Sequence, residues 1–141
     1  MTQLMKSKTL SVSIAASPGK VYKFVSNPEN LPIWASSFAK SVRCEDWKWI
    51  VETDNGFVTV RFMMKNTFGI LDHVVTLPSG EKIYNSMRVV QNGKGSEVLF
   101  MLFKTDFISD EQFERDAELV EIDLQSLKRI LENRNMIAKL Q

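Results

Sequence analysis

The last third of the chain carries one apolar stripe at helical spacing. Its members recur at alternating intervals of four and three positions, which places them on one face of an α-helix: Phe113, Ala117, Val120, Leu124, Leu127 and Leu131. Ser109 and Gln112 match a capping box, so the helix should begin at Ser109. A helix of about 25 residues spans roughly 40 Å. The rest of the chain must therefore supply a wide surface to cover this stripe.

The segment between residues 40 and 105 is typical of an antiparallel meander. Short alternating runs are separated by turn signals, which predict about six strands. The signals are Asp54-Asn55-Gly56, Phe68-Gly69, Pro78-Ser79-Gly80 and the four residues from Asn92 to Gly95. A further strand precedes the meander, because Leu10, Val12 and Ile14 alternate with small or polar residues.

Two short helices are predicted between the first strand and the meander. Ser17-Pro18 pairs a capping residue with a proline at the first helical position, and Asn27-Pro28 repeats the signal. We expect the second helix to run through Glu29 to Leu31 and to end near Pro32. The predicted fold class is therefore α+β.

The bulk properties favour one soluble globular domain over residues 1–141. Hydrophobic residues make up 44% and charged residues 25%, and 18 basic residues against 17 acidic ones leave a net charge of +1. This near-neutral net charge does not predict nucleic acid or anionic lipid as a binding partner. Cys44 is the single cysteine, so neither an internal disulfide nor a zinc cluster is expected. Without a secretory or membrane-spanning apolar run, we expect a cytoplasmic protein with no cofactor, metal, nucleic-acid partner or membrane insertion.

The turns also predict which side chains share a face of the sheet. A two-residue turn at Asn55-Gly56 pairs Val51 with Val60, Trp49 with Phe62 and Trp47 with Met64. A loop at 66–69 then pairs Met64 with Leu71 and Phe62 with His73, a loop at 79–81 pairs Val75 with Asn85, and the turn at 92–95 pairs Met87 with Phe100. The predicted inner face consists of Trp47, Trp49, Val51, Val58, Val60, Phe62, Met64, Leu71, His73, Val75, Leu77, Ile83, Asn85, Met87, Val89, Val98, Phe100 and Leu102.

His73 is the only histidine, and with Asn85 it forms the clearly polar part of this face. The predicted register sets the two in a diagonal relation, roughly 7 to 8 Å apart. Asp72 must point outward because strand side chains alternate, so Asp72-His73 is not a catalytic dyad. Three roles are open for His73: a general base, a polar anchor for a ligand, or a buried histidine of structural value only.

Aromatic and methionine side chains would line a cavity between the sheet and the long helix, although they could also simply be core. The candidate ligand-binding residues are Trp34, Trp47, Trp49, Phe62, Met64, His73, Asn85, Met87 and Phe100. Leu99, Met101 and Phe103 fall on the outer face instead. Either the short helices or a second subunit should cover them, which leaves room for a homodimer.

The order of elements, together with the stretch SIAASPGKVYKFVSNPENLPIW, resembles the helix-grip superfamily (START-like, Bet v 1-like, or SRPBCC). FGILDHVVTLPSGE followed by MRVVQNGKGSEVLFMLF is similar to its bacterial polyketide cyclase/dehydrase and lipid-transport branch. The resemblance covers nearly the whole chain. It implies a curved antiparallel sheet of about seven strands wrapped around the C-terminal helix.

Three functions are compatible with these features. The first is binding of a small hydrophobic molecule, lipid-like, aromatic or polyketide-like, in the cavity between sheet and helix. The second is a cyclase or dehydratase in which His73 transfers a proton. Such an enzyme needs a second polar group, for which Tyr22, Tyr84 and Asn85 are candidates. The third is a co-chaperone or toxin-like interaction protein, which predicts a filled cavity and a partner surface.

Overall fold

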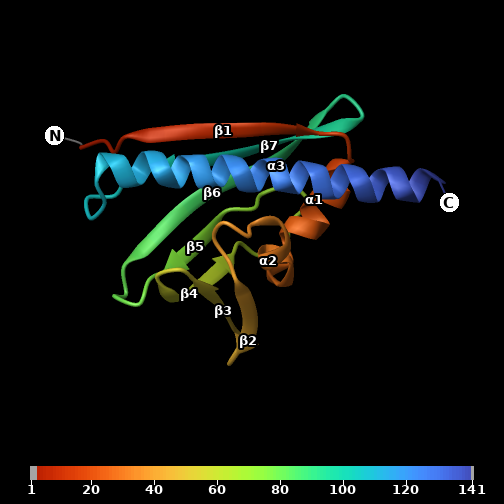
Figure 1. Cartoon of the computed structure of the whole chain (residues 1–141). Coiled ribbons are helices and arrows are strands. Elements are labelled where there is room, and N and C mark those ends of the chain that lie inside the picture. The colour runs from red at the N-terminus through yellow and green to blue at the C-terminus, as the bar shows by residue number, and fades with distance from the viewer. Residues whose placement is uncertain (1–2, 141) are drawn as a thin grey trace.

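The computed structural model describes residues 3–140, with side chains for residues 3–134. The predicted order of elements is confirmed: a strand, short helices, a six-stranded meander and a long helix (Figure 1). The elements are β1 (Ser7–Ile14), α1 (Pro18–Val25), the 3₁₀-helix η1 (Pro28–Asn30), α2 (Leu31–Trp34), β2 (Ser41–Glu45), β3 (Lys48–Thr53), β4 (Gly56–Phe62), β5 (His73–Thr76), β6 (Lys82–Asn92), β7 (Gly95–Phe103) and α3 (Asp110–Leu140).

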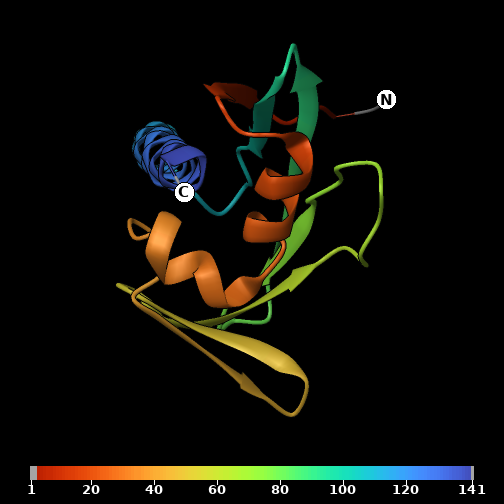
Figure 2. The ribbon, with the colours of Figure 1, turned by 90° about the vertical axis from the view of Figure 1, so that its right-hand side faces the viewer.

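One antiparallel sheet holds the described strands in the order β1-β7-β6-β5-β4-β3-β2. The sheet curves, and α3 lies along β1 on its concave side, with α1 and α2 also inside the curve (Figure 2). Residues of all three helices join the inner-face side chains in one core, to which α3 contributes Leu124, Leu127 and Leu131. The predicted helix-grip arrangement is confirmed.

Helix α3 begins where the capping signal predicts. The backbone N–H of Gln112 donates to Oγ of Ser109 at 3.1 Å. The side chain of Gln112 turns to Asp116 instead of returning to the cap, so only half of the predicted capping box forms. The helix has 31 residues rather than about 25, and its predicted stripe is buried except for half-buried Val120.

The two short helices begin at the predicted caps, because Ser17 and Asn27 each accept a hydrogen bond from a backbone N–H of the following turn. The predicted end near Pro32 was wrong. The chain passes from η1 directly into α2, whose first turn contains Pro32 and whose last residue is Trp34. Proline is accepted there because the first-turn N–H groups have no partner within the helix. Trp34 is consequently buried.

The predicted register is confirmed in two hairpins and wrong by two residues in two others. Phe62 faces His73, as predicted. Val51 faces Val58 rather than Val60, because the turn is centred on Asp54-Asn55. His73 directly faces Asn85 rather than Met87, because the loop between β5 and β6 consists of residues 78–80 and not of the predicted residues 79–81. A shift of two residues keeps every side chain on its own face, so most of the inner face is confirmed.

Trp47 and Met64 were wrongly assigned to the inner face. Trp47 is 97% exposed and Met64 is 84% exposed. Trp47 lies before β3 with a positive φ of 66°, and Met64 lies two residues beyond the end of β4. The alternation of faces holds only within a strand, and both residues lie outside one.

The short helices pack on the inner face with the core, so they do not cover Leu99, Met101 and Phe103. These three side chains are half-buried on the outer face. Among the described residues, no helix is both long and apolar enough to span a bilayer.

The loop between β4 and β5 is held together by Asn66. Its Oδ1 accepts hydrogen bonds from the backbone N–H groups of Phe68 and Ile70, and its Nδ2 donates to the carbonyls of Met64 and Ile70. The backbone N–H of Asn66 donates to the hydroxyl of Tyr22, which joins the loop to α1. This irregular segment is therefore ordered by one amide side chain.

We expect Gly69→Ala to destabilise the protein more than Gly93→Ala. Both glycines have positive φ, 73° and 59°. A Cβ on Gly69 would collide with the Val89 carbonyl oxygen, whereas one on Gly93 would meet nothing within 4 Å. Gly93→Ala should cost about 1 kcal/mol from backbone strain alone, and Gly69→Ala at least about 2 kcal/mol more. Urea unfolding of both variants measures the difference, and equal losses would contradict the close contact.

Candidate functional site

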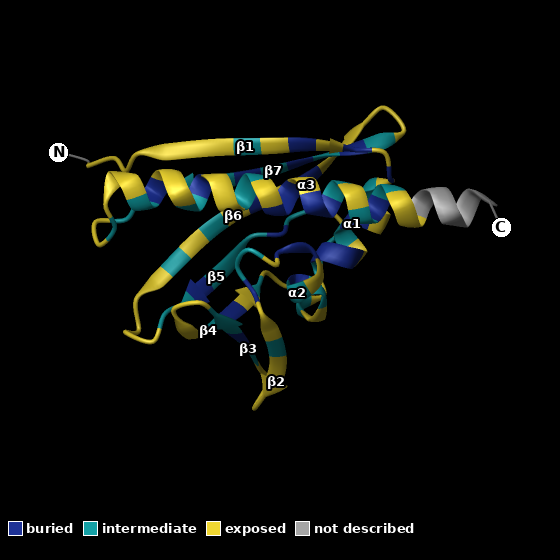
Figure 3. Ribbon diagram, viewed as in Figure 1, coloured by how far each residue is buried: buried dark blue, intermediate teal, exposed yellow. Residues whose placement is uncertain are grey.

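The inner face of the sheet is buried unevenly. Val51, Val60, Met87, Val89 and Val98 are fully buried. A neighbouring set of inner-face side chains is only half-buried, and we call it the inner strip: Trp49, Phe62, His73, Leu77, Ile83, Asn85 and Leu102. Figure 3 shows the change along β6, which has no buried residue near the β5–β6 loop. Mostly apolar side chains thus keep contact with solvent on the concave side.

His73 is held by two hydrogen bonds and two aromatic rings. Its Nδ1 lies 3.0 Å from the Leu71 carbonyl oxygen, which only accepts, so Nδ1 carries the proton. In the neutral ring Nε2 is then an acceptor, and it lies 3.3 Å from Nδ2 of Asn85. The ring centroids of Phe62 and Phe100 lie 4.9 and 5.7 Å away.

Burial lowers the pKa of His73, while the Leu71 carbonyl and the Asp72 carboxylate act more weakly in the opposite direction. The ring is therefore neutral at pH 7. The Asp72 carboxylate accepts from the Met87 N–H at 2.9 Å and lies 3.5 Å from the guanidinium of Arg88. It makes no hydrogen bond with the His73 ring, which confirms that the two residues are not a dyad.

Asn85 has hydrogen-bonding capacity to spare. One N–H of its amide donates to His73, which fixes the orientation of the group. Within the described part of the chain, its Oδ1 and second N–H have no partner. A half-buried amide of this kind offers one acceptor and one donor to a small polar group. Of the three polar groups considered alongside His73, only Asn85 shares its face, because Tyr22 holds the Asn66 loop and Tyr84 points outward.

The structure brings together four of the nine predicted site residues on the inner strip: Trp49, Phe62, His73 and Asn85. Met87 and Phe100 lie beside them in the core, and Trp34 is buried on α2. The indole N–H of Trp34 is buried without a partner among the described residues. Trp47 and Met64 lie in solvent instead. Leu77, Ile83 and Leu102 were predicted to face inward, but only the burial pattern marks them as part of the strip.

Asp123 is the other buried titratable side chain of note. It lies on α3 and accepts a hydrogen bond from the Ser37 backbone N–H at 3.1 Å. Burial raises its pKa, and the bonds from Ser37 act in the opposite direction. Because it joins the segment after α2 to α3, we assign it to structure. Within the described residues, no group of three or more potential metal-ligating side chains occurs.

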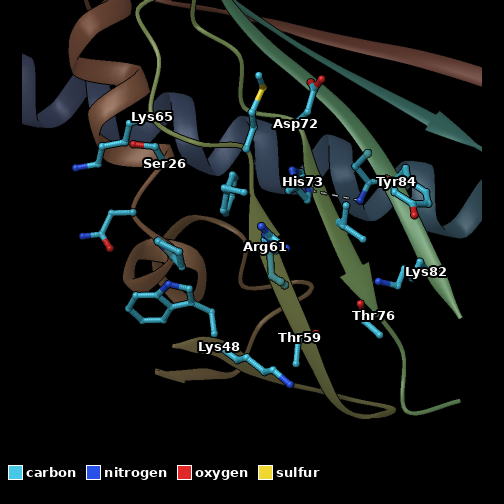
Figure 4. A pocket seen from close by; sticks show the side chains of 18 of the residues that line it. Ser26, Lys48, Thr59, Arg61, Lys65, Asp72, His73, Thr76, Lys82 and Tyr84 are labelled. Atoms are coloured by element: carbon cyan, nitrogen blue, oxygen red, sulfur yellow. Dashed lines mark hydrogen bonds between the residues drawn. The ribbon is translucent and has the colours of Figure 1, made fainter. Parts of the chain in front are cut away.

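A hollow of about 1780 Å³ opens on the outer face of the sheet, and we call it the outer groove (Figure 4). Outward side chains of β3 to β6 form much of its lining, including Lys48, Arg61 and Tyr84. Four residues of the inner strip also border it: Trp49, Phe62, His73 and Asn85. Residues of α1 and η1 close one side. The alternation of side chains explains why these strand positions face outward, but it contains no signal that the face is hollow.

Comparison with known proteins found matches among solved structures only. No protein-family model and no curated protein matches the sequence. Solved structures do match. A START superfamily protein from Mycobacterium smegmatis is 16% identical, with 90% of this chain and 97% of the other covered and a TM-score of 0.67. The Bet v 1 allergen Ara h 8.0201 is 13% identical, with 90% and 97% covered and a TM-score of 0.68.

The Aha1 dimer from Colwellia psychrerythraea gives a similar match. It is 17% identical, with 91% of this chain and 97% of the other covered and a TM-score of 0.68. Each match extends over nearly the whole length of the other chain. The chain therefore has the helix-grip fold that its sequence resemblance implied.

Proposed function

We propose that the chain binds a small, mainly apolar molecule on the inner strip, with the Asn85 amide as its polar contact. The observation that carries this proposal is the combination of half-exposed apolar side chains with an amide that has an unused donor and acceptor. Contiguous apolar surface around a few polar groups is typical of ligand sites. Trp49 and Phe62 supply flat surfaces for an aromatic or polycyclic ligand.

In this proposal His73 orients Asn85 rather than reacting. A proton-transfer role would need the lone pair of Nε2, which accepts the Asn85 N–H at 3.3 Å. The Asn85 amide would have to leave before a substrate could reach Nε2. Binding therefore fits the geometry better than the cyclase alternative.

Native mass spectrometry of freshly purified protein tests the proposal directly, because a bound small molecule adds its mass to that of the chain.

Ile83→Glu should abolish binding of an uncharged apolar dye such as N-phenyl-1-naphthylamine, while Tyr84→Glu should not. The two positions are neighbours on β6 but face opposite sides of the sheet. A carboxylate on the inner strip loses hydration when an apolar ligand covers it, so we expect at least about a tenfold loss of affinity. Dye fluorescence measures binding, with circular dichroism as the check on folding. Equal losses in the two variants would place the dye elsewhere.

Asn85→Leu should separate polar from apolar ligands. We expect 2-naphthol to lose about 1 kcal/mol of binding free energy, the usual scale of one hydrogen bond, while naphthalene binds as tightly as before. Displacement of the dye measures both. A variant that binds the two compounds with unchanged relative affinity would show that Asn85 is not the polar contact.

His73→Phe should change the pH dependence of stability. The pKa of His73 is lowered by folding, so below about pH 6.5 the unfolded chain takes up a proton that the folded chain resists. The free energy of unfolding contributed by this residue is therefore fully present above about pH 6.5 and decreases as the pH falls below it. Urea unfolding at about pH 7.5 and pH 5 should show the difference between wild type and His73→Phe shifting in favour of the variant at the lower pH. A difference independent of pH would contradict the lowered pKa.

A further inference from the structure

The outer groove concentrates positive charge. Five cationic side chains line it: Lys23, Lys48, Arg61, Lys65 and Lys82. Its single lining carboxylate, Asp72, is already engaged by the Met87 N–H and by Arg88. Among the described side chains, no carboxylate lies within 4 Å of any of the five cations. The groove therefore has a local surplus of positive charge, although the whole chain carries only +1.

Helix α3 carries a net negative charge. Helix α3 contains eight acidic and five basic residues, and the rest of the chain contains nine acidic and thirteen basic ones. The helix lies on the concave side, whereas Lys48, Arg61 and Lys82 point to the convex side. An approaching anion is consequently attracted to the outer face and repelled from the helical side.

Exposed aromatic side chains accompany the cations. Tyr84 is 65% exposed, and the register sets Arg61, Val74 and Tyr84 in one row across three strands (Figure 4). Trp47, which is 97% exposed, directly precedes Lys48 and also lines the groove. Thr59, Thr76 and Lys82 form the next row. Flat rings and unpaired cations thus alternate over the same surface.

The size of the groove points to an extended ligand. Three strand spacings from β3 to β6 span roughly 14 Å. The volume of about 1780 Å³ exceeds the range of about 300 to 1,000 Å³ typical of small-molecule pockets. A flat bilayer surface would not enter a groove, whereas a flexible strand would.

We propose that the outer groove binds single-stranded nucleic acid over a site of about four nucleotides. The five cations contact phosphates, and bases stack on Trp47 and Tyr84, which is the combination of charge and stacking that non-specific single-strand binding uses. The site could not be predicted from the sequence, because its charges are dispersed along the chain and folding brings them together. The proposal does not rest on ligand binding on the inner strip, although Trp49, Phe62, His73 and Asn85 border both sites.

The test is fluorescence anisotropy with a labelled single-stranded oligonucleotide of about 12 residues, titrated between about 50 and 200 mM salt. We expect affinity to fall roughly 10- to 100-fold over this range, since each phosphate contact contributes about −0.7 to the logarithmic salt slope of a single strand. Lys48→Glu with Arg61→Glu should weaken binding at least about tenfold and make the slope shallower. Trp47→Ala should weaken binding about fivefold or more with the slope unchanged, because it removes stacking and no charge.

The matched control is Lys94→Glu with Lys104→Glu, which changes the net charge equally at residues that do not line the groove. It should stay within about threefold of wild type. An equal loss in both double variants would overturn the proposal, because global charge would explain the binding. So would absence of binding by wild type at about 100 μM and low salt.

Two other occupants are distinguished by parallel measurements. If anionic phosphatidylserine vesicles bind through Lys48 and Arg61 while the oligonucleotide does not, the face is a membrane-docking surface and the proposal is wrong. If light scattering shows a dimer that Lys48→Glu with Arg61→Glu dissociates, the groove is an interface between two copies, which also overturns it. Ile83→Glu, which alters only the inner strip, should leave oligonucleotide binding unchanged.

Discussion

The packing of the α3 stripe into the curved sheet is the contact on which the rest of the structure depends. Leu124, Leu127 and Leu131 enter the main core together with the inner face and the short helices. Phe113 and Ala117, nearer the start of α3, are buried outside that cluster. The helix therefore seals the inner face over part of its width only. The inner strip is the apolar surface that this incomplete cover leaves half-exposed, so the candidate site is a consequence of how far the helix and the short helices reach.

Faces could be predicted from the sequence much better than positions along the strands. Two hairpin registers were wrong by two residues, yet Val58 and Asn85 still face inward, because the side-chain period of a strand is two. The predicted positions were wrong where residues lie outside a strand, because the alternation of side chains no longer applies there. Trp47 and Met64 lie just outside strands, and the loop between β4 and β5 is ordered by Asn66, whose five bonds no pattern of hydrophobic residues encodes. Pro32 was read as a stop, although the first turn of a helix accepts it.

The candidate site could be predicted in part for a related reason. His73 and Asn85 are the polar residues of an otherwise apolar face, which the alternation rule detects directly. Their direct pairing depends on the length of the loop at 78–80. The distribution of charge, in contrast, could not be predicted from the sequence. The count of 18 basic and 17 acidic residues does not show that folding gathers five cations in one groove, because composition carries no information on where side chains lie in space.

The alternation that defines the two faces also keeps them chemically separate. On β6, Ile83 faces the apolar strip, whereas Lys82 and Tyr84 face the charged groove, and Asn85 borders both. A change at one residue therefore reaches one face directly and the other only through the backbone. The two faces influence each other at His73, because the Asp72 carboxylate acts on the His73 ring through its field while it pairs with Arg88 on the outer side. An anion in the outer groove would lie near this junction and would add to the same field. Since a negative field raises the pKa of an imidazole, occupation of the outer groove should oppose the effect of burial on His73. Electrostatics thus couples the outer groove to the inner strip, and His73 and Asn85 border both.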